Sequence, residues 1–308
     1  MRFALLAPIV VLALTSPAAG QDDGIPRLGD HQFVPVPTIA EPFMTTFVQT
    51  QVDLAFTFDS QLPVYSAADS TELGLVDVNQ AFTALAFRYQ HRVQDWLVVQ
   101  TEVGFLGRLG TDTSSIVASG ITGALMYELG WMIRMARTES TMLSGSLALG
   151  SNTATFVDPL GWANSIIEGE PARLVVSRSS LAGTGGLHGA WALGRRFGLL
   201  GAMKASYGEA FDSQGENGWH TDARAALSYD AEQDLRIPVG LALTGGWAEN
   251  ETTGDTDARR WFWSLRIAAK GRSDFTVGLQ LGVSYFESKD RDDPLKLFET
   301  GIDMRYYY

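Results

Sequence analysis

Twelve stretches of the chain alternate apolar and polar residues with a period of two, and this repetition restricts the fold more than any other feature of the sequence. In the last stretch, Met304, Tyr306 and Tyr308 fall on one parity. Asp303 and Arg305 fall on the other. Such alternation predicts a strand with one apolar and one polar face. The twelve stretches are residues 43–58, 80–90, 96–108, 120–137, 141–151, 181–193, 197–211, 219–230, 235–248, 258–270, 275–286 and 295–308.

The connections between these stretches alternate in length. The short ones have three or four residues and cover 92–95, 138–140, 194–196, 231–234 and 271–274. The longer ones cover 59–77, 110–119, 152–180, 212–218, 249–257 and 287–294. Short turns at one end and long loops at the other, on an even number of strands, favour a membrane barrel over a soluble sandwich. We therefore predict an all-β fold, a transmembrane antiparallel up-and-down β-barrel of 12 strands over residues 43–308.

The closing stretch resembles the last strand of bacterial outer-membrane β-barrels, because it alternates and ends on the aromatic Tyr308. The resemblance covers residues 43–308 and implies that Tyr306 and Tyr308 form part of a signal read by the barrel assembly machinery of Gram-negative bacteria. It also implies contact with outer-membrane lipid and lipopolysaccharide, and two termini that face the periplasm. Within that class the chain looks most like porins and small-solute channels. A looser similarity to channels associated with aromatic degradation rests on no motif.

The N-terminal residues indicate export. Arg2 precedes an apolar run over residues 3–14 and a small-residue stretch over 16–20, so residues 1–20 have the layout of a cleavable signal peptide. Residues 21–41 contain three prolines without periodicity, and we expect residues 21–42 to form an extended periplasmic lead-in. The chain has no Cys, which excludes disulfides and thiolate metal sites, and its net charge of -12 argues against a nucleic-acid partner.

The polar parity of the strands should line the lumen, because the opposite register would expose charged groups to hydrocarbon. Many inward positions are Gly or Ala, which predicts a narrow, water-filled lumen. The candidate lumen-lining or constriction residues are Arg88, Arg134, Arg224, Arg236, Arg266, Arg305, Asp53, Glu102, Glu128 and Asp303. Two interpretations remain open. The charges brace the wall by pairing with one another, or the basic ones form a belt low in the lumen that selects anionic or carboxylate solutes.

No catalytic site is readable in the sequence. His220, Asp222 and Ser228 share a face, but a nucleophile and a base within reach of each other cannot be assigned. Acid clusters in the long loops match no calcium-binding loop, and the 152–180 loop is apolar enough to fold into the mouth or pack on the rim. We predict a channel for small hydrophilic solutes, with a preference for anions as its sharper form, without catalytic residues, metal or cofactor. The alternatives are an outer-membrane enzyme of the lipid hydrolase or protease type and a structural or adhesive barrel with a plugged lumen.

Overall fold

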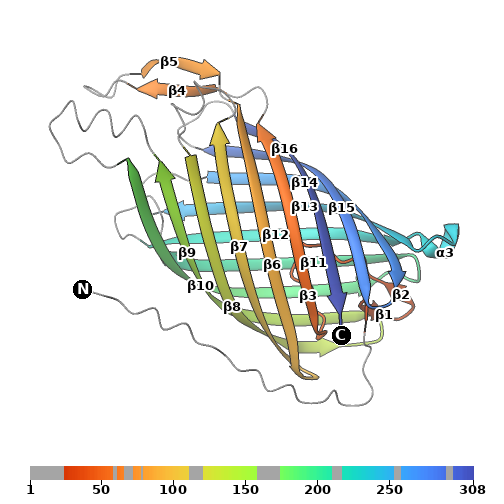
Figure 1. Cartoon of the computed structure of the whole chain (residues 1–308). Coiled ribbons are helices and arrows are strands. Elements are labelled where there is room, and N and C mark those ends of the chain that lie inside the picture. The colour runs from red at the N-terminus through yellow and green to blue at the C-terminus, as the bar shows by residue number, and fades with distance from the viewer. Residues whose placement is uncertain are drawn as a thin grey trace.

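Twelve antiparallel strands form one closed barrel, as predicted (Figure 1). The structure is a computed structural model that describes residues 24–57, 61–65, 72–77, 79–110, 121–157, 174–209, 217–252, 258–288 and 294–308. The barrel strands are β3 (Phe47–Thr57), β6 (Gln80–Gln94), β7 (Leu97–Gly110), β8 (Ile121–Arg137), β9 (Thr141–Val157), β10 (Val175–Ala192), β11 (Phe197–Glu209), β12 (Asn217–Asp230), β13 (Val239–Thr252), β14 (Ala258–Arg272), β15 (Phe275–Ser288) and β16 (Leu295–Tyr307). The expected signal peptide and the remaining loop residues lie outside the described residues.

The first and last barrel strands close the sheet. β16 pairs with β3 from Tyr307↔Phe47 to Leu297↔Thr57, so every barrel strand has two neighbours. The strands have 11 to 18 residues, and a tilted strand needs about 9–11 to cross the hydrocarbon of a bilayer. None of the helices in the described residues has the length and apolar character to cross a membrane.

The predicted parity is confirmed on the outer wall. Leu54, Leu147, Trp263 and Tyr306 all point outward and are 43%, 64%, 57% and 45% exposed, although they are large and apolar or aromatic. The neighbouring positions on the same strands face the lumen. An apolar wall of this extent is stable only against lipid, since in water it would drive aggregation.

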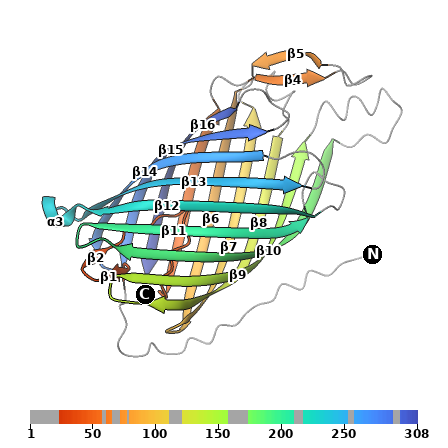
Figure 2. The ribbon, with the colours of Figure 1, turned by 180° about the vertical axis from the view of Figure 1, so that it is seen from behind.

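The ends of the barrel differ as the alternating connections predicted. At the end that we call the short-turn end, four connections have two to four residues, while the fifth, 231–238, contains the short helix α3 (Glu232–Leu235). Figures 1 and 2 show α3 and the C-terminus at this end and the hairpin β4 (Gln61–Tyr65) and β5 (Glu72–Asp77) at the opposite, long-loop end.

Several strand boundaries were predicted wrongly: the first barrel strand begins at Phe47 instead of residue 43, and the second ends at Gln94 instead of residue 90. The ninth barrel strand begins at Val239 instead of residue 235, because Arg236 has a left-handed φ of 55° and Pro238 has no N–H to donate to a ladder. The predicted loop 152–180 is much shorter, because β9 and β10 pair as far as Val157↔Val175. The apolar residues of that loop beyond 157, and the acid clusters at 255–257 and 290–293, lie outside the described residues.

The expected lead-in instead occupies the lumen. Residues 24–46, which we call the plug, include the two-residue strands β1 (Arg27–Leu28) and β2 (His31–Gln32) and run directly into β3. Figures 1 and 2 show β1 and β2 at the short-turn end. Phe33, Val34 and Val36 are 0% exposed, so the plug is a packed core element of the folded chain.

Candidate functional site: the lumen and its plug

An apolar socket holds the plug in the half of the lumen next to the short turns. Phe33, Val34, Val36, Ile39 and Phe43 form one buried cluster with wall residues. The wall residues of that cluster that face the plug are mostly small, with a few larger ones: Val98, Met132, Met142, Ala190, Ala192, Leu200, Ala202, Ala226, Ala242 and Ala268. The inward Gly and Ala positions do leave space, and in this half the plug fills it.

Two wall glycines are needed for the close approach of the plug. A Cβ at Gly198 would lie 2.5 Å from Cδ2 of His31 and 2.6 Å from Cε1 of Phe33. A Cβ at Gly240 would overlap Cγ2 of Val34. A side chain at either position would therefore force the plug away from the wall.

His31 joins the plug to the short-turn end of the wall. Its Nδ1 lies 3.1 Å from the Arg195 carbonyl oxygen, which can only accept, so Nδ1 donates and Nε2 accepts from the Ser228 hydroxyl at 3.2 Å. The Val34 N–H donates to the same hydroxyl at 3.0 Å. Burial lowers the pKa of His31 from its ordinary value, and nearby Asp230 opposes that shift. The docked plug thus favours a neutral imidazole.

The tip of the plug meets charged side chains halfway up the lumen. Arg224 Nη1 donates to the Thr38 carbonyl at 2.5 Å, and Arg88 Nη1 donates to the Pro37 carbonyl at 3.4 Å. Each guanidinium also has an acid. Arg88 Nε donates to Glu102 at 2.8 Å and Arg224 Nε to Asp222 at 2.6 Å.

The base of the plug carries a fully buried ion pair. Arg305 Nη1 lies 2.8 Å from Glu41 Oε1, and the two side chains are 1% and 5% exposed. Arg305 also donates to Gln49 Oε1 at 2.8 Å and lies over the Phe47 ring, 4.4 Å from its centroid. Glu41 accepts from the Val36 N–H at 3.1 Å. The pair therefore fixes the turn of the plug to the closing strand.

A second buried pair belongs to the wall. Arg266 binds Asp303 through two hydrogen bonds of 2.9 and 2.6 Å, with both side chains at most 2% exposed. Three more pairs are Arg88–Glu102, Arg224–Asp222 and Arg305–Glu41. Most arginines of the predicted basic belt are therefore paired with an acid.

The half of the lumen next to the long loops is polar and more open. Arg260 binds Glu299 at 2.6 Å and lies over the rings of Phe262 and Phe286. Leu106 and Met126 are inward by parity yet 40% and 38% exposed. Asp53 accepts from Gln51 Nε2 at 2.6 Å. No segment that the structure describes packs against the lumen side chains in this half.

The other predicted site residues are dispersed. Glu128 lines a small polar hollow with Lys204 and Ala40, next to Arg88 and Glu102. Arg134 lines a hollow at the short-turn end. Arg236 lies in the turn after α3 and is exposed, so its prediction as a lumen residue was wrong. Tyr306 and Tyr308 face outward, and the centroids of their rings are 6.0 Å apart. Their role in assembly stays a prediction.

The structure does not bring the predicted histidine group together. His220 bonds Asn250, Asp222 binds Arg224, and Ser228 bonds the plug. One pair that the sequence did not reveal lies in the lumen wall, where Ser146 Oγ is 2.7 Å from His188 Nε2. No carboxylate among the described residues hydrogen-bonds to His188, so the pair lacks the third member of a hydrolytic triad.

Solved structures share this architecture. An outer membrane channel from Pseudomonas putida F1 superposes with a TM-score of 0.55 at 14% identity, over 90% of this chain and 100% of that chain. The chain therefore has the fold of bacterial outer-membrane β-barrels. The translocator domain of the autotransporter NalP from Neisseria meningitidis gives a TM-score of 0.50 at 12% identity, over 86% of this chain and 88% of that one. No protein-family model matches the chain, and no curated protein matches it.

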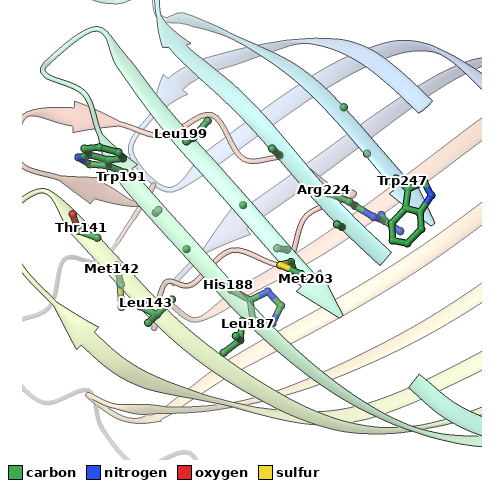
Figure 3. A pocket seen from close by; sticks show the side chains of 18 of the residues that line it. Thr141, Met142, Leu143, Leu187, His188, Trp191, Leu199, Met203, Arg224 and Trp247 are labelled. Carbon is green, nitrogen blue, oxygen red and sulfur yellow. The ribbon is translucent and has the colours of Figure 1, made fainter. Parts of the chain in front are cut away.

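A large hollow lies on the outer wall of the barrel. Its volume is about 670 Å³, and its rim includes Leu143, Trp191, Met203 and Trp247 (Figure 3). Its floor is a row of small residues paired strand to strand, Gly189↔Gly201, Gly201↔Ala225 and Ala225↔Gly245. This hollow faces lipid and is separate from the lumen.

Proposed function

We propose that this protein is an outer-membrane channel for small hydrophilic solutes, and that the plug must leave its socket for solutes to pass. The observation that carries the proposal is the division of the lumen. A polar, open half leads directly to a socket of small residues, and of the described residues only the plug, residues 24–46, fills this socket. Without the plug, the same small residues would leave a continuous narrow passage.

The attachments of the plug support reversible docking. It is joined covalently to the barrel only at β3, and elsewhere it is held by apolar contacts, a few hydrogen bonds and the Glu41–Arg305 pair. Each of these contacts can be broken without disturbing the strand ladder. We propose weak selectivity between ions, because most of the basic belt is paired with acids.

A disulfide lock tests this proposal. Val34 and Gly240 lie in contact, which is the proximity that a disulfide requires, and the chain has no other Cys. In planar bilayers we expect the oxidised Val34→Cys/Gly240→Cys variant to be closed and the reduced variant to conduct like the wild type. The Val34→Cys variant serves as the control, because Gly240→Cys alone would meet Cγ2 of Val34, which is absent from the double variant. Equal conductance in both redox states would show that the plug does not control passage.

A sealed structural barrel is the alternative that the plug itself favours. It predicts no conductance from the wild type or from the reduced double variant, and the further variant to compare is one with residues 24–42 deleted. Conductance in the deletion variant alone would mean that the plug is a permanent seal.

We also propose that the short-turn end faces the periplasm. A tag inserted at residue 290 should then be labelled on intact cells, whereas a tag at residue 233, in the connection that contains α3, should not. The opposite result would reverse the orientation.

A further inference from the structure

A hollow of about 160 Å³ lies between the plug and the wall at the short-turn end. Four arginines and one acid line it, which gives a formal charge of +3. They are Arg27, Arg92, Arg134, Arg137 and Asp95. We call this feature the basic hollow.

The arginines of the basic hollow come from both of the parts that must separate when the plug moves. Arg27 belongs to β1 of the plug. Arg92 lies near the end of β6, and Arg134 and Arg137 lie at the end of β8. A ligand held between them would therefore connect the plug to the wall.

The single acid of the lining leaves Arg27 and Arg134 without an ion-pair partner among the residues that the structure describes. Asp95 hydrogen-bonds to Arg92, and that bond is the main reason why the pKa of Asp95 lies below its ordinary value. Within the described part of the chain, Arg27 donates only to the neutral Gln32, at 3.3 Å. Arg134 is half-buried and forms no ion pair with any residue that the structure describes. Elsewhere in the lumen, Arg88, Arg224, Arg260, Arg266 and Arg305 all have acids.

We propose that the basic hollow binds a phosphate-bearing anion that bridges the plug and the barrel wall. Guanidinium groups bind phosphate oxygens through charge-assisted hydrogen bonds, and several of them can share one phosphate. The volume corresponds to about five waters at roughly 30 Å³ each, which is room for a phosphate group. Phe43, Met44 and Met142 form an apolar part of the lining, so the anion is recognised from the arginine side. Binding stabilises the docked plug, whatever solute the lumen carries.

The first experiment uses the full mature chain refolded in non-ionic detergent without phospholipid. Calorimetric titration with inorganic phosphate, against chloride at equal ionic strength, should show saturable binding at one site. In the Arg27→Gln/Arg134→Gln variant, the affinity for inorganic phosphate should fall at least tenfold. The control Arg196→Gln/Arg272→Gln changes two exposed arginines of other short turns, which lie outside the hollow and pair with Asp234 and Asp274 of the wall, and should bind as the wild type does.

A second titration uses detergent micelles that contain phosphatidic acid. It distinguishes a lipid headgroup from free inorganic phosphate as the ligand. Binding of this lipid, lost in Arg27→Gln/Arg134→Gln and kept in the control, supports the site with a lipid headgroup as ligand even where inorganic phosphate fails. Saturable binding of inorganic phosphate supports it with a free anion. Absence of both kinds of binding in the wild type, or an equal loss in the control variant, overturns the proposal.

A third measurement uses the unmodified chain, so its result does not depend on whether a variant folds. Hydrogen exchange at the amides of residues 27–32 should slow severalfold when inorganic phosphate or phosphatidic acid is added, because the ligand holds Arg27 against the wall. Exchange in β15, which does not contact the hollow, should stay unchanged. Equal exchange at residues 27–32 with and without both ligands would contradict the bridge.

Discussion

The two halves of the lumen are built from the same strands, but the plug fills one half and the other is more open. Next to the short turns, Ala and Gly positions form a dry socket, and charges there are buried in pairs such as Arg305–Glu41. Next to the long loops, pairs such as Arg260–Glu299 remain partly exposed, at 35% and 22%. The composition of the wall alone therefore does not determine whether a lumen holds water. The plug removes water from one half, and this makes every contact there worth more.

The largest difference should come from the apolar contacts. Phe33→Ala removes a fully buried ring from the socket and should weaken docking of the plug by about 3–5 kcal/mol, which is more than a hundredfold. Leu106→Ala, in the open half, should change docking by less than about 0.5 kcal/mol. The labelling rate of a Cys introduced at Val36, which is buried only in the docked plug, measures both. Similar rates in the two variants would remove the distinction between the halves.

The ion pairs give a comparison of the same kind. Glu41→Gln leaves Arg305 buried without an acid and should weaken docking by about 3 kcal/mol. Glu102→Gln breaks a pair whose side chains are 19% and 30% exposed, and should weaken it by at most about 1 kcal/mol. The Val36→Cys labelling assay applies again. A larger effect from Glu102 would show that the tip, instead of the base, anchors the plug.

The basic belt can be tested by changing Arg134 and Arg266 together to Gln. Because Arg266 is paired with the buried Asp303, we expect a lower temperature for the gel-mobility transition of the folded barrel and an unchanged reversal potential in a salt gradient. Arg134→Gln alone should leave the transition unchanged. A shift of the reversal potential would favour the belt as an anion filter.

The smallest expected effect is that of pH on the plug. The docked state lowers the pKa of His31, so a released plug binds a proton more readily below its ordinary pKa of about 6.5. Docking should weaken as the pH falls through and below that value and should be constant above it. The charged groups that face His31 are Asp230 and Lys270, which form a buried pair of 2.5 Å.

Val36→Cys labelling at pH 5 and pH 7.5 measures this effect, with His31→Gln as the variant that should lose it. An identical pH response in His31→Gln would assign the effect to another group, with the Asp230–Lys270 pair as the first one to test.

The sequence by itself determined the barrel. A period of two over 11 to 18 residues assigns each side chain to one face, and a shift by one residue would turn the whole apolar set inward. Twelve strands, their order and the lipid-facing parity of residues such as Leu54 and Tyr306 therefore follow from local pattern. The start of the strand at Val239 was missed, although Pro238 gave a local signal for it.

Only the tertiary structure determined where residues 24–46 lie. A segment without periodicity carries no local sign of what surrounds it, and its unpaired backbone groups are satisfied by side chains far away in sequence. Gln90, Ser144 and Ser228 supply such bonds to Phe43, Pro42 and Val34. The apolar residues between its prolines were the available sign that it is not a solvated tail.

The pairing of the charges was decided in the same way. Glu41 and Arg305 are 264 positions apart, and parity could place Arg305 in the lumen but could not give it a partner. Pairing depends on barrel closure, which brings β16 beside β3 and the plug beside both.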